Sequence, residues 1–256
     1  MLLEKKNAII YGAGGSLGAA VAKKFAAEGA RVFLAGRTKE TLAAVAAEIG
    51  EKAEVDVVDA LDERAIDEHA ASVVERGGSI DVSLNLITRG DVQGIPLLDM
   101  SPGDLVECIV NGVTANFLTA RAAGRQMVRQ GHGTILGLNS GSAQGSPMMG
   151  GTGLADAATD TLIRNLAIEL GPAGVRVLGL WVAGVPETLT VEKLSKVNAN
   201  ITAEAVQGIL DNLAGMRLTK RSPRIDEVAA TIAFLASDQA AGITGTMVNV
   251  TSMFTS

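Results

Sequence analysis

The stretch AIIYGAGGSLGAAVAKKFAAEGA, from Ala8 to Ala30, carries the strongest structural signal in this chain. A short apolar run leads into a cluster of glycines, and a longer segment with helical periodicity follows, which predicts a buried strand, a tight turn and a helix. Gly12, Gly14 and Gly15 permit positive φ angles and the close approach of a phosphate. Gly18 lets the helix lie tightly on the strand. Because free amides at the helix start face the turn, we expect a dinucleotide-binding turn here.

Apolar runs of the same kind alternate with helical patterns along the chain. Seven of them have the length and β-branched content of buried strands, and they lie at residues 7–12, 30–36, 53–59, 80–88, 133–140, 175–184 and 244–251. Strands this apolar are covered on both faces, and right-handed crossovers through helices are nearly the only way to join them. The sequence therefore predicts a Rossmann-like α/β fold, a doubly wound parallel sheet of about seven strands in three α/β/α layers, with ligands bound at the carboxyl ends of the strands.

Length and composition favour a single domain over residues 1–256. The chain is 47% hydrophobic and 20% charged, and it contains no linker-like or low-complexity segment. The segment 186–222 interrupts the alternation, because it is longer than a tight connection and polar enough to lie outside the core. We expect short helices in it and a lid-like role; the alternative is a surface excursion without function.

Net charge and residue usage restrict the kinds of binding partner that are expected. A net charge of −6 leaves no basic excess, so no nucleic acid or anionic membrane is expected and a small-molecule substrate is favoured. The N-terminal apolar run is too short for a signal peptide, and no run approaches the roughly 20 apolar residues of a membrane span, so we expect a cytoplasmic protein. The single cysteine, Cys108, lies in apolar surroundings, which predicts a buried free thiol. The two histidines, His69 and His132, are isolated from each other, and there is no cysteine cluster, so no metal site is expected.

The end of the second expected strand bears on the choice of cofactor. It carries Gly36 and Arg37, with no acidic residue at that place. A free ribose 2′-hydroxyl is usually held there by a carboxylate, whereas a 2′-phosphate is matched by a guanidinium. Arg37 therefore favours NADP(H) over NAD(H), the alternative being a solvated arginine at a strand end.

These motifs resemble those of the short-chain dehydrogenase/reductase family over almost the whole chain. YGAGGSLG is similar to the family's TGxxxGxG turn, with Ser16 in place of its middle glycine and Leu17 before the last one. NLIT keeps the first asparagine of the family's NNAG, and AGVPET keeps the threonine of its PGxxxT. The resemblance implies further cofactor contacts at Asp56, Val57, Asn85 and Thr188. It also implies a homodimer or homotetramer paired through helices four and five.

The resemblance further implies an active-site frame from which two residues are missing. Asn111 in VNG stands at the family's helix-four asparagine, and Ser140 in LNSGS stands at its active-site serine. LAIEL at 166–170 is similar to the family's LAxEL. Counting back from it places Thr152 at the position of the catalytic tyrosine and Asp156 at that of the lysine.

The missing pair decides the chemistry. Reduction of a carbonyl by hydride needs a proton donor, which in the family is a phenol, and the chain's one tyrosine, Tyr11, belongs to the glycine turn. The Thr152 hydroxyl is far less acidic than a phenol, whose usual pKa is near 10, and an ionised Asp156 reverses the charge that a lysine supplies. The family's mechanism therefore does not transfer to this chain.

Three functions remain open at this point. The chain is an atypical NADP(H)-dependent oxidoreductase in which a water held by Ser140, or a protonated Asp156 without basic neighbours, supplies the proton. Alternatively, it is an NADP(H)-binding module without catalysis, which reports cofactor state or supports a catalytic partner subunit. A third possibility is a reaction without net redox change, such as isomerisation. Arg89 is expected to meet solvent or an acidic substrate, and Met148 and Met149 are candidates to fill the nicotinamide end of the site.

Overall fold

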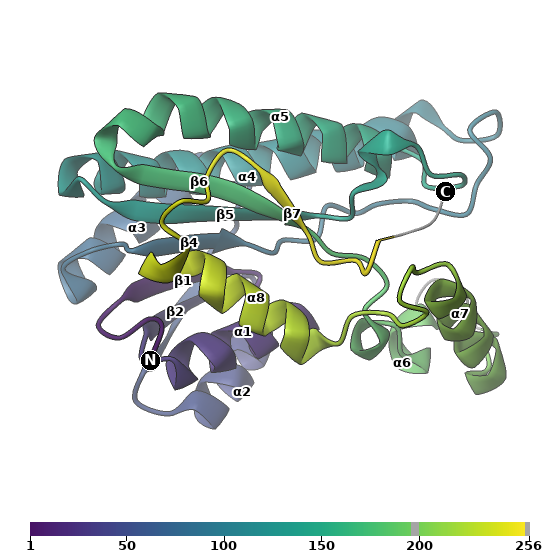
Figure 1. Ribbon diagram of the computed structural model, residues 1–256, viewed down its shortest axis with the longest axis horizontal. Coiled ribbons are helices and arrows are strands. Elements are labelled where there is room, and N and C mark those ends of the chain that lie inside the picture. The colour runs from purple at the N-terminus through teal and green to yellow at the C-terminus, as the bar shows by residue number, and fades with distance from the viewer. Residues whose placement is uncertain (196–199, 254–256) are drawn as a thin grey trace.

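The computed structural model describes residues 1–195 and 200–253, which form a three-layer α/β/α fold (Figure 1). The central sheet is parallel, with strand order β3-β2-β1-β4-β5-β6-β7. Its strands are β1 (Asn7–Tyr11), β2 (Arg31–Gly36), β3 (Ala53–Val57), β4 (Val82–Asn85), β5 (Gly133–Asn139), β6 (Val175–Trp181) and β7 (Met247–Asn249). Each expected run contains one of these strands, so the predicted fold class is confirmed.

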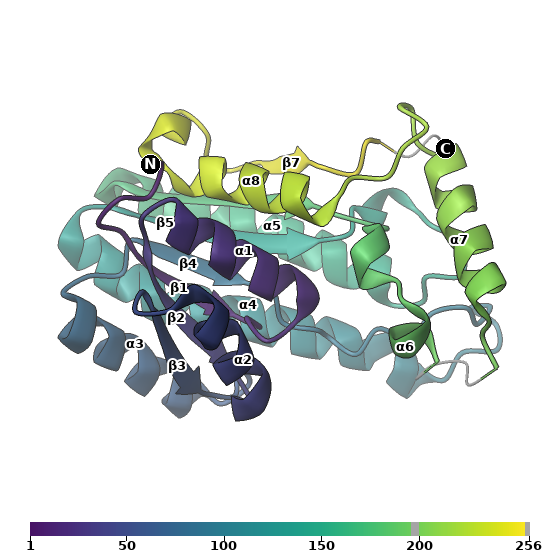
Figure 2. The same ribbon diagram turned by 90° about the horizontal axis from the view of Figure 1, so that it is seen from below.

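Helices cover both faces of the sheet. Figure 2 shows three of them on one face, namely α1 (Ser16–Ala27), α2 (Lys39–Ile49) and α8 (Ile225–Ala236). The opposite face carries α3 (Glu63–Gly77), α4 (Pro102–Gln130) and α5 (Thr152–Leu170). Neighbouring strand residues point to opposite layers: Ile10 packs in the core under α1 and α8, while Ile9 and Tyr11 pack in the core under α3 and α4. This alternation explains why the strands are apolar throughout.

Local signals set the helix ends. The Ser101 side chain caps α4 by accepting a hydrogen bond from the Asp104 amide, Pro102 stands in the first turn, and Gly131 ends the helix in the left-handed conformation. Asp62 caps α3 in the same way, with Gly78 at its end. Such ends fix where each crossover begins and stops.

The order of the strands reverses at β1, which lies between β2 and β4. A reversal of strand order of this kind leaves a crevice at the carboxyl ends of the neighbouring strands. The glycine turn follows β1 at this point, and the Gly12 amide donates to Ala35 O at 2.8 Å. The fold therefore places the turn where a ligand has access to it.

The segment 186–222 leaves the layers beyond the carboxyl end of β6. It holds a 3-10 turn at Pro186–Thr188, a short helix α6 (Val191–Leu194) and the helix α7 (Ala203–Gly215). In Figures 1 and 2, α6 and α7 lie off the end of the sheet, apart from the helices that cover its faces. Residues 196–199 lie outside the described residues. The segment's role as a lid stays a prediction.

The described residues contain neither a membrane-spanning helix nor a cluster of metal-binding side chains. Over residues 1–195 and 200–253, no helix is long and apolar enough to cross a membrane. Within the same residues, His, Cys, Asp and Glu side chains form no group of three or more that could hold a metal ion.

Candidate cofactor cleft and active site

A cleft of about 640 Å³ runs along the carboxyl ends of β1, β2 and β4. The glycine turn forms its middle. Arg37 and Thr41 line one end, and Arg89 and Asn111 line the other. The cleft is long enough to connect the end of β2 with the loop after β4, as an extended dinucleotide requires.

The glycine turn is shaped to receive a phosphate group. Gly12 has a φ of +82°, and a Cβ there would lie 2.7 Å from Leu86 O. A Cβ on Gly18 would overlap the backbone of Gly12, so α1 can lie this close only with glycine at that position. Ser16 and Leu17 form the first turn of α1, which contains no acidic residue and has no side-chain cap from Gly15. The first amides of the helix are therefore free for a diphosphate, and the turn fits a nicotinamide dinucleotide.

Arg37 lies exposed at the end of β2, where it lines the cleft beside Thr38 and Thr41. Within the described part of the chain, its guanidinium makes no hydrogen bond or ion pair. Thr38 precedes the first residue of α2 but makes no side-chain cap, so the amides of that helix start are also free. A free guanidinium beside a helix N-terminus is suited to a phosphate.

The adenine contact expected at Asp56 and Val57 stays a prediction, and the structure places both residues on β3. Neither residue lines the cleft, because β3 still runs through both of them and the chain turns toward the cleft only afterwards, at Asp59. Asp56 instead accepts hydrogen bonds from Arg76 Nη2 at 2.9 Å and lies 3.2 Å from His69 Nε2. Partial burial opposes ionisation of Asp56, but the hydrogen bonds from His69 and Arg76 outweigh it and lower its pKa.

Asn85 and Thr188 also lie away from the cleft wall, contrary to expectation. Asn85 is buried, and its Oδ1 accepts from the Ile87 amide at 2.9 Å, so it shapes the turn after β4. Thr188 Oγ1 donates to Val185 O at 2.7 Å within its own 3-10 turn. Each side chain satisfies nearby backbone groups, which leaves the cleft wall to Leu86, Ile87 and neighbouring residues.

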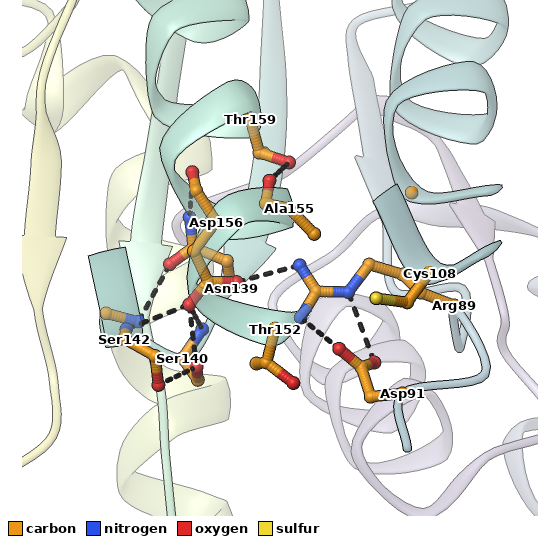
Figure 3. Close-up of polar contacts among 12 residues, drawn as sticks. Arg89, Asp91, Cys108, Asn139, Ser140, Ser142, Thr152, Ala155, Asp156 and Thr159 are labelled. Atoms are coloured by element: carbon orange, nitrogen blue, oxygen red, sulfur yellow. Dashed lines mark hydrogen bonds and ion pairs between the residues drawn. The ribbon is translucent and has the colours of Figure 1, made fainter. Parts of the chain in front are cut away.

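Asp156 is the centre of a hydrogen-bonded cluster at the start of α5 (Figure 3). Its Oδ2 accepts from the Ser140 hydroxyl at 2.6 Å and from the amides of Ser142 at 2.9 Å and Ser140 at 3.1 Å. Its Oδ1 accepts from Arg89 Nη1 at 2.7 Å. These four contacts fit a carboxylate, since a protonated group would turn an acceptor oxygen into a donor. The expectation that no basic residue lies beside Asp156 is therefore wrong, because Arg89 contacts it directly.

Arg89 reaches Asp156 from the loop after β4, 67 residues earlier in the chain. Its Nη2 also donates to Asp91 Oδ1 at 2.9 Å, and its side chain is only 13% exposed. Burial opposes the charge, but Asp91 and Asp156 more than compensate and raise the pKa of Arg89. The stem of Arg89 lies where a side chain on Gly112 would be. Arg89 thus binds two carboxylates of its own chain, rather than only solvent or an acidic substrate.

The other expected catalytic residues lie on two sides of Arg89. Thr152 is buried at the first position of α5 and accepts from Gln93 Nε2 at 3.1 Å, and Ser140 is half-buried beside Asp156. Asn111 lines the cleft and donates to Arg89 O at 3.3 Å. The structure therefore brings Ser140, Thr152 and Asp156 together behind Arg89, while Asn111 faces the cleft.

Arg89, rather than a methionine, closes this end of the cleft. Met148 and Met149 are not part of the cleft wall. The Gly94 amide instead donates to Met148 O at 2.7 Å, which ties the loop after β4 to the turn before α5. The sequence contains two signals of this arrangement: a basic residue in the loop after the fourth strand, and a glycine following Asn111.

Tyr11 and Cys108 lie inside the protein. The Tyr11 hydroxyl is 3.1 Å from His69 Nδ1, and burial, with a smaller contribution from Asp56, raises the pKa of the phenol. Tyr11 is fully buried, so it is not a proton donor to a ligand in the cleft. Cys108 is a buried free thiol, as expected, and burial raises its pKa as well.

Comparisons with known proteins find relatives over almost the whole chain. A family model described as enoyl-(acyl carrier protein) reductase matches residues 12–252. The short-chain reductase protein NovJ of Streptomyces niveus is 32% identical and aligns over 96% of this chain and 93% of its own length.

Two solved structures match almost the whole chain. NAD+-bound xylitol dehydrogenase has a TM-score of 0.87 at 25% identity, with 99% of this chain and 100% of that one covered. The 3-ketoacyl-(acyl-carrier-protein) reductase from Brucella melitensis complexed with NADH has a TM-score of 0.83 at 26% identity, with 98% of each chain covered. With its glycine turn at the β1 switch point, the chain belongs to the short-chain dehydrogenase/reductase family, oxidoreductases that bind NAD(P)(H) and act on hydroxyl and carbonyl groups.

Proposed function

We propose that this chain is an NADP(H)-dependent oxidoreductase in which Ser140 and Asp156 take over the proton path of the missing tyrosine and lysine. The observation that carries the proposal is the 2.6 Å hydrogen bond from the Ser140 hydroxyl to the Asp156 carboxylate. A bond this short between a hydroxyl and a carboxylate is charge-assisted and strong. It gives the site a proton acceptor close to where the family binds its substrate oxygen.

The polarity of this bond favours an alcohol as the substrate. Because Ser140 donates its proton to Asp156, its oxygen is left as an acceptor, which matches a hydroxyl group and not a carbonyl. During oxidation, the proton of the substrate hydroxyl passes to Ser140 Oγ as the Ser140 proton passes to Asp156. The bound cofactor supplies the hydride acceptor. Reduction of the ketone uses the same path in reverse, with the proton starting on Asp156.

The preference for NADP(H) rests on Arg37. The solved relatives named above contain NAD+ and NADH, so they support the nicotinamide dinucleotide class without choosing between its members. Arg37 is exposed just after β2 and has no partner among the residues that the structure describes, and it lines the cleft near the uncapped N-terminus of α2. A 2′-phosphate bound there would meet a guanidinium and a helix N-terminus together.

A second candidate is an NADP(H)-binding subunit without catalysis. It is favoured by Arg89, which ends the cleft and covers Asp156, whose exposure is 0%. Asp156 itself is closed to a substrate as long as Arg89 stays in this position. In this second function the cofactor is bound, while the proton path stays closed.

We also propose a homo-oligomer paired through α4 and α5. These two helices expose large apolar side chains to solvent, among them Val106, Val110, Phe117, Leu154 and Ile168. Exposed apolar side chains gathered on neighbouring helices are typical of a protein interface. A second copy of this chain is the partner that the family resemblance implies.

The two candidate functions are separated by one set of variants. Wild type, Ser140→Ala and the control Ser146→Ala, which changes an exposed serine, are assayed with secondary alcohols and NADP+ and with ketones and NADPH. For an oxidoreductase, Ser140→Ala loses about 100-fold to 10,000-fold in turnover, NADPH binding is kept, and Ser146→Ala behaves as wild type. Binding without turnover on the whole panel selects the non-catalytic subunit. Absence of NADPH binding contradicts both.

A further inference from the structure

We propose that Lys193 is a ligand for the diphosphate of the bound dinucleotide, an inference that rests on the proposed cofactor binding. Lys193 lies on α6, and its Nζ donates a hydrogen bond to Ser16 Oγ at the start of α1, 177 residues away in sequence. Figure 2 shows α6 near the end of α1 that follows the glycine turn. A cation from the 186–222 segment thus reaches the place where the turn presents its free amides.

Local contacts hold Lys193 in position. Thr190 caps α6, and its carbonyl and hydroxyl oxygens accept from the Lys193 amide at 3.1 and 3.3 Å. Just before α6, Glu187 forms a 2.7 Å ion pair with Arg224 at the start of α8. The ion pair of Glu187 thus links the start of the segment to α8, and the Thr190 cap orders the backbone at Lys193.

The charges around Lys193 favour the binding of an anion. The N-terminus of α1 carries a partial positive charge, and its first turn holds no acidic residue. Across residues 1–195 and 200–253, no carboxylate forms an ion pair with Lys193. An ammonium and a helix N-terminus repel each other. An anion between them is attracted both to the ammonium and to the helix N-terminus. The ammonium has three donors, of which Ser16 takes one.

A diphosphate is the anion that fits. It is the charged part of a dinucleotide that lies over a glycine turn of this kind. Because NADPH and NADH share this group, Lys193 contributes to both cofactors alike, unlike Arg37 at the end of β2. Binding at this point also links α6 to the cofactor.

The test compares Lys193→Ala and Lys193→Arg with the control Lys220→Ala, a lysine of the same segment whose Nζ binds Gly215 O instead. Affinities for NADPH, NADH and adenosine 2′-phosphate, which lacks a diphosphate, are measured by calorimetry. Lys193→Ala is expected to weaken NADPH and NADH by about tenfold each, equivalent to about 1.4 kcal/mol. Lys193→Arg recovers most of the loss, while adenosine 2′-phosphate binding and Lys220→Ala are unchanged.

The outcomes separate this inference from the proposed function. Wild-type binding of NADPH with unchanged affinity in Lys193→Ala overturns the role of Lys193 and leaves cofactor binding standing. A similar loss for adenosine 2′-phosphate, or in Lys220→Ala, also overturns it, because the effect would then be general. A wild type that binds neither NADPH nor NADH overturns both.

Discussion

Replacing Arg89 by methionine tests whether Asp156 depends on its buried ion pair. Methionine keeps an unbranched stem in the space beside Gly112 and removes the guanidinium that lies 2.7 Å from Asp156 Oδ1. Asp156 is 0% exposed, so water cannot replace the lost partner. Two unit charges ~4 Å apart attract by roughly 4 kcal/mol at an effective dielectric of 20. Breaking a buried pair from one side typically costs about 3–5 kcal/mol.

Three hydrogen bonds from Ser140 and Ser142 still reach the carboxylate in this variant, so the lower end of that range applies. We expect the free energy of unfolding to fall by about 3 kcal/mol and Tm by roughly 6–12 °C for a domain of this size. Urea titration gives the first quantity and calorimetry the second. The double variant Arg89→Met with Asp156→Asn should recover part of the loss, because it removes the unpaired buried charge.

Arg64→Met is the matched control for this experiment. Arg64 pairs with Glu68 on the surface of α3 with its side chain 87% exposed, so its loss should change the unfolding free energy by less than about 0.5 kcal/mol. If Arg89→Met is no more destabilised than this control, or if the double variant recovers nothing, the account of Asp156 as a carboxylate held by Arg89 is refuted.

Two further predictions concern other sites. Arg37→Ala should weaken NADPH by roughly 1.5 to 3 kcal/mol and leave NADH unchanged, because only the 2′-phosphate loses a charged contact; calorimetry measures this, and equal wild-type affinity for the two cofactors would contradict it. Asp56→Asn should lower stability near neutral pH, since Arg76 and His69 hold the pKa of Asp56 below its unfolded value. That contribution is present above the unfolded pKa of about 3.9 and is lost as pH falls through the folded pKa. Urea unfolding of both proteins should therefore converge in acid, and a constant difference down to the lowest accessible pH would disprove the linkage.

The sequence alone determined the elements of the fold and the glycine turn. The strands follow from short apolar, β-branched runs, the helices from a period of 3.6 residues, and the turn from glycines that follow the first apolar run. These signals are local, so each is complete within a few residues. The expectation that the family's tyrosine and lysine are replaced also rests on local sequence, because the position of Asp156 is counted along a single helix.

Predictions from local sequence failed where the partner of a side chain lies on a distant part of the chain. Asp56 and Asp59 lie in the same short run, and only the end of β3 at Val57 decides which of them faces the cleft. The surroundings of Asp156 looked apolar in sequence, yet Arg89 arrives from a loop 67 residues away.

Only the tertiary structure shows which charged groups meet at the site. Arg89 can pack where it does because residue 112 has no side chain. Lys193 reaches Ser16 for a similar reason, since α6 and α1 meet only once the sheet has formed. Sequence patterns determine which face of an element is buried, whereas the pairing of charges depends on distances between elements that no local pattern contains.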